Sequence, residues 1–290
     1  MKDEALMAKE RKAFHKALVS KSILTIGENG VASNADGSNK PSREIAAFVA
    51  KRLGAKKGAK LPPQSSGSLF EAEVCSFIKA TFPKMRHLRP GKWHVMHLGN
   101  SNPVKTASFA QYEHLAHLAK VLNADKELVA MLGNDYMVTP DIVIARGTCE
   151  DVEINETSRF VDAHVSLCSD LRKSYNPLPL MHASISAKWT MRSDRAQNSR
   201  TEALNLIRNR KGHLPHIVVV TGEPLPSRLA SLALGTGDLD CVYHFALYEL
   251  MDAVKQYGAD GREDIIDQLE SLVNGKRLKD ISDLPLDLCC

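Results

Sequence analysis

Two carboxylates and a lysine in the second half of the sequence belong to the residue types that bind divalent metal ions and activate water. Asp141 follows Pro140 and precedes the apolar run IVIA. Ser186 and Lys188 lie two residues apart in HASISAKWTM, so a strand would project both side chains from one face. Glu202 follows in TEALNLIRNRK. Because Mg²⁺ is held by carboxylates, water and phosphate oxygens, and a nearby lysine can orient the attacking water, this set indicates phosphodiester hydrolysis.

Each of these residues also has an ordinary structural interpretation when it is taken alone. An Asp after Pro at the start of a strand, such as Asp141, is usually a turn residue. Lys188 alone reads as a solvated strand residue, and Glu202 as a first-turn helix carboxylate that the helix dipole favours. The pattern PD…SxK is short and recurs by chance, so its weight comes from the basic stretch beside it.

That basic stretch covers residues 184–211, which carry seven Lys and Arg and two acids, whereas the net charge of the whole chain is only +4. Within it, Arg192 and Arg195 bracket Asp194. Arginine can donate two hydrogen bonds to guanine in the major groove, and a carboxylate can accept from the cytosine amino group. Three further basic residues suit phosphate contact, namely Arg208, Arg210 and Lys211. The alternative is a solvated basic helix with a weak surface Arg–Asp pair.

Other catalytic, metal-binding and targeting patterns are missing from the sequence. No CxxC pair occurs among the six cysteines, and no Cys or further acid completes a zinc site at the three histidine pairs His94/His97, His114/His117 and His213/His216. Neither a Walker loop nor GxSxG is present. No window has the apolar length of a membrane span or a signal-peptide core. We therefore expect reduced thiols, a cytoplasmic location and no membrane partner.

The elements that must position these residues change character near Thr139. Upstream, periodicity predicts helices over residues 3–20, 42–53, 68–82 and 105–133, with Ser42 as the cap of the second and Gly54 past its end. Downstream, strands over 139–147, 182–191 and 216–224 alternate with a helix over 201–212, and 240–258 passes from strand to helix. This order predicts an α/β fold with a central mixed β-sheet flanked by helices. We expect one domain over 1–290, helical to about 135 and with its sheet core at about 136–250.

At this point the residues show a family resemblance. The chain resembles type II restriction endonucleases of the PD-(D/E)xK superfamily. The resemblance is carried by RKAFHK, VASNADGSN, RPGKW, TPDI, HASISAKWTMRSDRAQNSR, NLIRNRKGHLPHIVVVT, PSR, ALGTGDLDCVYHFALYEL and VNGKRLKDISDLPLDL, which together run through nearly the whole chain. It is weakest over residues 146–180.

The resemblance implies a restriction-endonuclease-like fold and a Mg²⁺-dependent enzyme with two metal ions per active site. It implies cleavage of double-stranded DNA at GCCGGC after the first G, which leaves 5′-phosphates and four-nucleotide 5′ overhangs. It further implies a homotetramer of two back-to-back dimers in a bacterial cytoplasm, where a cognate DNA methyltransferase protects host sites without needing to bind the enzyme.

The resemblance also implies catalytic roles. Asp141 would be the central metal ligand, Lys188 the lysine that orients water, and Glu202 a ligand of the second metal through water. Ser186 stands where most relatives carry an acid. Ala187, where we expect Cys, would contribute only its backbone carbonyl to a metal.

Further residues gain a role from the resemblance alone. Glu71 would complete the active site from an earlier helix, although Ser68 and Glu71 equally fit a capping box. The recognition residues would be Arg192, Asp194 and Arg195 for the inner CCGG, Asp36 and Arg228 for the outer G·C pair, and Gln64 for the minor groove. Two other functions stay open, a structure-selective repair nuclease of the same superfamily and a non-catalytic DNA-binding module.

Overall fold

The computed structural model describes residues 4–99, 103–124, 139–191, 193–235, 237–259 and 261–290, and it describes the side chains of all of these except 103–104, 122–124 and 193–196. The chain divides into two compact units. The larger unit comprises residues 1–85, 185–201 and 217–290, and the smaller unit comprises residues 86–184 and 202–216. Each unit is described by itself.

Both units contain helices and strands. The helices of the larger unit are α1 (Leu6–Ser20), α2 (Lys40–Arg52), α3 (Pro63–Thr81), η1 (Phe82–Met85), α8 (Pro226–Ala233), α9 (Leu247–Gly258), α10 (Glu263–Asn274) and α11 (Leu284–Asp287). Those of the smaller unit are η3 (Pro103–Ser108), η4 (Ala110–Tyr112), α4 (His114–Ala124) and α6 (Asp151–Ile154), and α7 (Ser193–Asn209) runs through both. The strands are β1 (Trp93–His97), β2 (Ile142–Arg146), β3 (Leu180–Lys188), β4 (His216–Thr221), β5 (Cys241–His244) and β6 (Leu278–Asp280).

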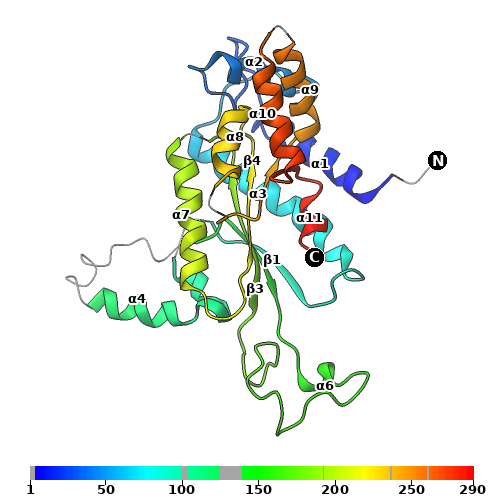
Figure 1. Ribbon diagram of the computed structural model, residues 1–290, viewed down its shortest axis with the longest axis vertical. Helices are drawn as coiled ribbons and strands as arrows, with labels where there is room; N and C mark the ends of the chain where they lie inside the picture. Colours follow the sequence, from blue (N-terminus) through cyan, green and yellow to red (C-terminus); the bar gives the residue numbers. More distant parts are fainter. Residues whose placement is uncertain (1–3, 100–102, 125–138, 192, 236, 260) are drawn as a thin grey trace. The chain divides into compact units, whose positions relative to one another are not determined.

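The strands form a six-stranded sheet in the order β1-β2-β3-β4-β5-β6 (Figure 1). In the smaller unit β1 pairs antiparallel with β2, with Trp93 opposite Arg146. In the larger unit β4, β5 and β6 pair in parallel. The sheet is therefore mixed and flanked by helices, as the sequence predicts.

Strand β3 is covered on both faces. The sequence predicts that its serines and its alanines project from opposite sides. Residues 183–187 are nonetheless all buried, including Ser184 and Ser186. Burial on both faces is typical of a strand inside a sheet that helices cover. Ser186 and its neighbours are thus held in a rigid, largely dry setting.

Helices of the larger unit pack in pairs around the sheet. Helix α1 contacts α3, α2 contacts α9, and α10 contacts both α8 and α9, beside which it lies in Figure 1. An aromatic cluster joins the first pair to the end of β3, because the Phe70 ring lies 6.4 Å from Phe14 and 5.0 Å from Trp189. The core of this unit therefore includes Trp189, the residue that directly follows Lys188 in the chain.

Helix α2 begins earlier than predicted. It starts at Lys40, and Asn39 caps it, with its side chain accepting a hydrogen bond from the Ser42 N–H at 2.9 Å. Ser42 is buried, and its hydroxyl accepts the Asp36 N–H at 3.0 Å. The prediction of Ser42 as the cap is therefore wrong. Gly54 lies past the helix end with φ +73°, as predicted.

Helix α3 also begins earlier than predicted, at Pro63 rather than Ser68. Proline suits the first helical turn because its fixed φ is helical and its missing N–H would have no partner there. Two consequences follow. Gln64 lies in the first turn of α3, and Glu71 lies in the interior of the helix. The capping-box interpretation of Glu71 is wrong.

The predicted helix over 105–133 is broken into η3, η4 and α4, and residues 125–133 lie outside the described residues. Gln111 explains the break. Its side-chain amide donates to the Met181 carbonyl at 2.8 Å, and its oxygen accepts the Met181 N–H at 2.9 Å. This tertiary pairing with β3 outweighs helix propensity. Strand β1, which lies in the part we predicted to be helical, was missed because WHVMH shows no clear alternation.

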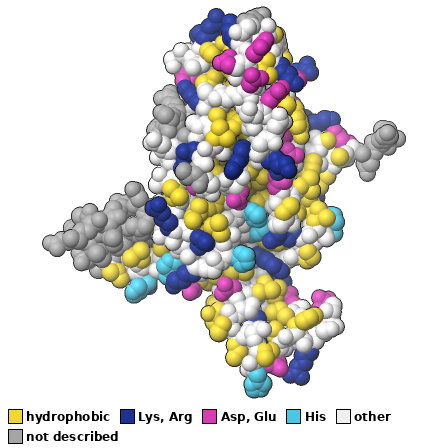
Figure 2. All heavy atoms as spheres, in the orientation of Figure 1, with side chains coloured by type: hydrophobic (Ala, Val, Ile, Leu, Met, Phe, Trp, Pro, Cys, Tyr) yellow, Lys and Arg dark blue, Asp and Glu magenta, His cyan; other side chains and the backbone are white. Residues whose placement is uncertain are grey.

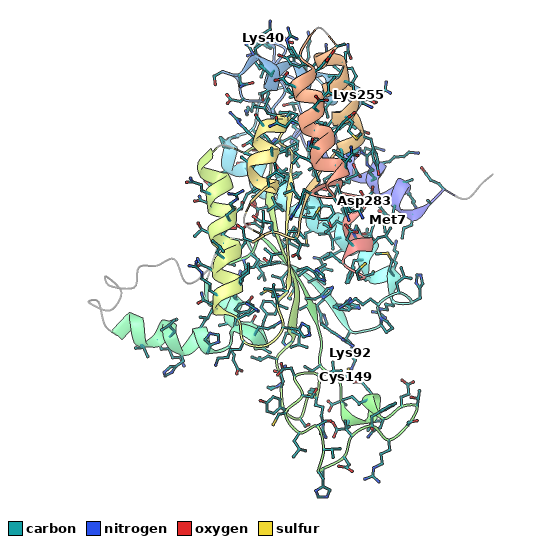
Figure 3. All side chains as sticks on the ribbon, viewed as in Figure 1. Met7, Lys40, Lys92, Cys149, Lys255 and Asp283 are labelled. Atoms are coloured by element: carbon teal, nitrogen blue, oxygen red, sulfur yellow. The ribbon has the colours of Figure 1, made fainter. Side chains whose placement is uncertain are left out.

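A lobe formed by residues 149–176 belongs to the smaller unit. Arg172 is only 4% exposed and makes a two-bond contact to the Asp151 carboxylate at 2.9 and 2.6 Å. Lys92, labelled in Figure 3 with Cys149, pairs with Glu153 of the lobe at 2.6 Å. Hydrophobic side chains gather on the lobe, which lies at the bottom of Figure 2. Its large exposed apolar residues are Val152, Phe160, Val165, Leu167 and Tyr175.

Among the described helices, none is long and apolar enough to cross a membrane.

Candidate functional site

The end of β3 carries Ser186, Ala187 and Lys188. Ser186 is 9% exposed, Ala187 is buried, and Lys188, the last residue of the strand, is half-buried. The Lys188 carbonyl accepts hydrogen bonds from the Thr221 hydroxyl at 2.9 Å and from the Gly222 N–H at 3.2 Å. These bonds fasten the end of β3 to the end of β4. The backbone of Lys188 is therefore held at the end of the sheet.

Asp141 directly precedes β2 in the smaller unit. Its carbonyl accepts the Leu98 N–H at 2.9 Å, which continues the pairing of β1 with β2. Its side chain is buried, since the residue is only 2% exposed. A turn aspartate is normally solvated, and a carboxylate is buried at a high cost unless it has charged or metal partners. The burial of Asp141 therefore disfavours its interpretation as a solvated turn residue.

Glu202 lies in the middle of α7. The sequence predicts a helix that begins near residue 201, which would put Glu202 in its first turn. Because α7 begins at Ser193, the first-turn interpretation of Glu202 is wrong. The residue is half-buried.

Of the three residues predicted to read the inner CCGG, two belong to α7. Arg192 lies outside the described residues. Asp194 and Arg195 lie in the first helical turn, and their side chains are outside the described ones. The sequence predicts that the helix begins near residue 201, whereas α7 begins at Ser193 and so includes Asp194 and Arg195.

Asp36 and Arg228 lie 192 residues apart in sequence and form an ion pair in the larger unit. The Ser38 N–H and hydroxyl donate to the other Asp36 oxygen at 3.0 and 2.6 Å. The bonds from Ser38 and Arg228 hold the pKa of Asp36 well below its usual range. Both side chains remain partly exposed, so they present fixed donors and an acceptor to solvent.

Glu223 was missed by the sequence reasoning. It is 1% exposed, and its carboxylate accepts the Met191 N–H at 3.0 Å and the Leu225 N–H at 3.1 Å. Arg228 Nη1 lies 3.7 Å from Oε2. Burial raises the pKa of Glu223 to about 7, against the opposing effect of Arg228 and the two N–H groups. A Glu between Gly222 and Pro224 looks like a surface turn residue, so the sequence offered no signal.

A pocket of about 170 Å³ in the larger unit collects these groups. Its lining includes Asn34, Asp36, Pro63, Glu223 and Arg228. Gln64 follows Pro63 directly and is exposed, so the helix that carries it borders the same pocket. Glu71 lies further along that helix and is half-buried.

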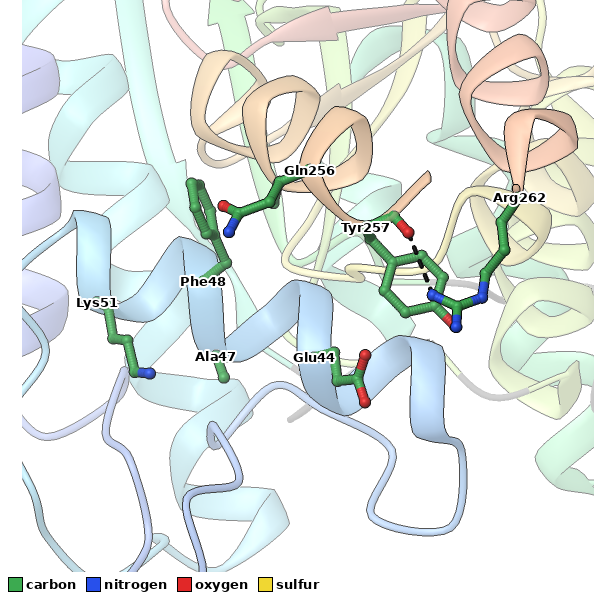
Figure 4. A pocket seen from close by; sticks show the side chains of 8 residues that line it. Glu44, Ala47, Phe48, Lys51, Gln256, Tyr257 and Arg262 are labelled. Atoms are coloured by element: carbon green, nitrogen blue, oxygen red, sulfur yellow. Dashed lines mark hydrogen bonds between the residues drawn. The ribbon is translucent and has the colours of Figure 1, made fainter. Parts of the chain in front are cut away.

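A second pocket, of about 350 Å³, lies where α2 meets α9 (Figure 4). It is lined by Glu44, Phe48, Tyr257 and Arg262, among others. The Arg262 guanidinium lies 4.6 Å from the centre of the Tyr257 ring and donates to the Tyr257 carbonyl at 3.3 Å. Its lining contains a single carboxylate, that of Glu44, and none of the residues predicted for the active site, so we assign it no part in the chemistry.

The described residues contain no cluster of three or more His, Cys, Asp or Glu side chains placed to hold a metal. Mg²⁺ needs no such cluster, because proteins bind it through one or two carboxylates and leave its other positions to water and substrate phosphate. Asp141 fits that requirement, because it is a buried carboxylate and carboxylate oxygens are ligands that Mg²⁺ binds.

The mixed six-stranded sheet with flanking helices is consistent with a restriction-endonuclease-like fold. Comparison with known proteins agrees: the model of the NgoMIV restriction enzyme family matches residues 14–290. The chain is 51% identical to the type II restriction enzyme NgoMIV of Neisseria gonorrhoeae over 284 aligned residues. The aligned region covers 98% of each chain. The chain therefore belongs to the NgoMIV restriction enzyme family. It is a type II restriction enzyme, a site-specific deoxyribonuclease whose class depends on a divalent metal ion.

Proposed function

We propose that this enzyme cleaves double-stranded DNA at GCCGGC after the first G, leaving 5′-phosphates and four-nucleotide 5′ overhangs, and that its metal is Mg²⁺, with two ions per active site. We propose further that residues 1–290 act as one endonuclease domain. The observation that carries the proposal is the ion pair of Asp36 with Arg228, in a chain that matches its relative along 98% of its length.

The ion pair supports recognition of the outer G·C pair for a chemical reason. In the major groove, guanine offers two acceptors and cytosine one amino donor. Arg228 supplies donors and Asp36 an acceptor, and they already lie side by side. In this proposal the inner CCGG is recognised by Arg192, Asp194 and Arg195, and the minor groove is contacted by Gln64.

For catalysis, we propose that Asp141 would be the central metal ligand, that the Ala187 carbonyl would be a further ligand, and that Glu202 would act through water. Bound Mg²⁺ supplies charge neutralisation at the phosphate and lowers the pKa of water. Lys188 would orient the attacking water. Ser186 takes the position of the usual acid, and Glu71 adds a carboxylate from α3. The support is the burial of Asp141 and the fixed backbone of Lys188.

The direct test is a digestion with Mg²⁺ of a plasmid that carries one GCCGGC site, followed by sequencing of the ends. We expect a single linear product with four-nucleotide 5′ overhangs, and no product from a matched plasmid in which that site is altered. Cutting confined to branched or frayed DNA would instead indicate a structure-selective nuclease. Binding without cutting at any metal concentration would indicate a DNA-binding module.

Arg228→Ala is expected to relax the choice of the outer base pair. Loss of a two-bond guanine contact costs about 1–3 kcal/mol of discrimination, so the preference for GCCGGC over ACCGGT should fall about 5- to 150-fold. Initial cleavage rates on the two duplexes measure this ratio. Arg43→Ala is the matched control, since Arg43 is an exposed arginine on α2 that does not line the pocket. An unchanged ratio in Arg228→Ala refutes the outer-pair assignment.

We also propose a homotetramer of two dimers. The lobe of residues 149–176 supports it, because the lobe exposes large apolar side chains such as Val152, which is 83% exposed, and Phe160, which is 61% exposed. Patches of this kind mark contacts between proteins. Sedimentation equilibrium should therefore give roughly four times the chain mass of 31.9 kDa.

A further inference from the structure

The buried carboxylate of Glu223 contacts both segments that carry the recognition residues. Through Oε2 it accepts the Met191 N–H at 3.0 Å and lies 3.7 Å from Arg228 Nη1. Arg228 Nη1 in turn donates to the Met191 carbonyl at 3.1 Å. Both polar groups of the Met191 backbone are thereby engaged, one by Glu223 and one by Arg228.

Met191 is the residue directly before Arg192 and lies two positions before Ser193, the first residue of α7. Arg228 is also paired with Asp36. The Glu223 carboxylate thus contacts two groups that we propose recognise DNA. One is the segment that leads to Arg192, and the other is the Asp36–Arg228 pair. All of these contacts lie within the larger unit.

We propose that Glu223 is a positioning residue for sequence recognition, which sets the place of Arg228 and of the Met191 backbone so that the outer G·C pair is selected. This inference rests on the proposed function, in which Arg228 reads that pair. Glu223 is too deeply buried to touch DNA and acts through Arg228 and Met191.

The chemistry requires a carboxylate and not only a side chain of that size. Ionised glutamate accepts hydrogen bonds through both oxygens, whereas glutamine presents one oxygen and one NH₂ donor. A glutamine side chain at position 223 can accept a hydrogen bond from the N–H of Met191 or from the N–H of Leu225, but not from both. Its NH₂ group, which is a donor, would face the other N–H. It also removes the negative charge beside Arg228.

Hydrogen bonds from neighbouring groups hold the loop that carries the Glu223 carboxylate. Asn34 lines the same pocket and donates to the Gly222 carbonyl at 2.8 Å, which holds the loop that carries Glu223. The Glu223 N–H donates to the Thr221 hydroxyl at 3.2 Å, and that hydroxyl donates to the Lys188 carbonyl. The recognition cluster is therefore hydrogen-bonded to the end of the strand that carries Lys188.

The test compares full-length variants on four duplexes that share the inner CCGG and differ in the outer pair: GCCGGC, ACCGGT, TCCGGA and CCCGGG. We expect Glu223→Gln to lower the ratio of kcat/KM for GCCGGC over the others by about tenfold or more. Glu223→Asp, which retains the charge, should recover part of the ratio. Glu73→Gln is the matched control, because Glu73 is another buried glutamate of the larger unit and pairs with Lys21 away from the pocket.

A wild-type ratio in Glu223→Gln would overturn the proposal. An unchanged ratio in Arg228→Ala as well would show that the proposed function has failed, because the outer pair is then read elsewhere. A loss of ratio in Arg228→Ala alone would refute the role of Glu223 and keep the proposed function.

A pH series on the wild type gives a second readout that needs no substitution. The charged group next to Glu223 is Arg228 of α8, and Arg228 in turn pairs with Asp36 of the loop before α2. Among these three residues, Glu223 is the one that titrates near neutrality, with a pKa of about 7. We expect the GCCGGC preference to fall between pH 8 and pH 6 in the wild type and to stay level in Glu223→Gln. Parallel pH profiles in the two proteins would contradict the proposal.

Discussion

Substitution of Lys188 by Ala is expected to lower the rate of cleavage at GCCGGC by about 10²- to 10⁴-fold while DNA binding is retained. The side chain lies at the end of β3, where it contributes an ammonium group that orients water in the proposed mechanism. Its removal leaves the strand intact, because the bonds from Thr221 and Gly222 go to the Lys188 carbonyl, which Ala also has. Single-turnover cleavage with Mg²⁺ and binding with Ca²⁺ in place of Mg²⁺ separate the two effects.

Lys279→Ala is the matched control for this experiment. Lys279 is also a strand lysine, and it pairs with Asp287 at 2.6 Å in the larger unit. Its loss removes an ion pair but should leave cleavage near the wild-type rate. If Lys188→Ala cuts as fast as Lys279→Ala, the assignment of Lys188 is wrong. If Lys188→Ala loses binding together with cleavage, the residue acts in DNA contact rather than in chemistry.

The strands that consist of one continuous apolar run, β2 and β4, were more predictable than the helix boundaries, and the reason is physical. A strand in a covered sheet is apolar along its whole length, so the runs before Arg146 and after Pro215 are visible in the sequence as IVIA and IVVV. Helix boundaries depend on which polar group reaches a free N–H. Ser42 and Asn39 both have suitable side chains, and tertiary contact between Ser42 and Asp36 decides between them.

The candidate site was predictable in its residue types and much less so in its contacts. Ser186 and Lys188 share a strand, so spacing alone relates them. Asp36 and Arg228 are separated by 192 residues, and no local pattern links them. Their roles came from family resemblance, and their pairing came from the fold. Glu223 lacked both signals, because a buried acid in a Gly-Glu-Pro sequence looks like an ordinary turn.

A buried ion triad in the larger unit gives the second large prediction. The Arg11 guanidinium of α1 contacts Asp280 at 2.9 Å and Glu249 of α9 at 2.6 Å, each through two hydrogen bonds. Burial acts to raise the pKa of Asp280 and of Glu249, but the hydrogen bonds and charge of Arg11 outweigh it and lower both. One guanidinium thus compensates two carboxylates, one of them with a fully buried side chain.

Arg11→Met is expected to reduce the free energy of unfolding of the larger unit by about 3–5 kcal/mol near pH 7, because it leaves two carboxylates without their cation in a poorly solvated place. Urea unfolding followed by fluorescence in a Trp93→Phe background measures it, since the remaining tryptophan, Trp189, belongs to the larger unit. The same side-chain replacement at Arg52 is the control. Arg52 reaches Asp252 of α9 at 3.9 Å with both side chains more than half exposed, so its loss should cost under about 1 kcal/mol.

The pH dependence of the Arg11→Met effect separates lost charge pairing from lost packing. In the wild type the carboxyl pKa values of Asp280 and Glu249 are lowered, so their contribution to stability is complete above the unfolded-state pKa, about 4, and disappears as the pH falls through the folded values. In the variant the unpaired acids have raised pKa values and are relieved by protonation. The difference between the two proteins should therefore narrow as the pH falls below about 5. A difference that stays constant from pH 8 to pH 4 would assign the effect to the packing of Arg11 on the Tyr248 ring, 4.7 Å away, instead of to its charge.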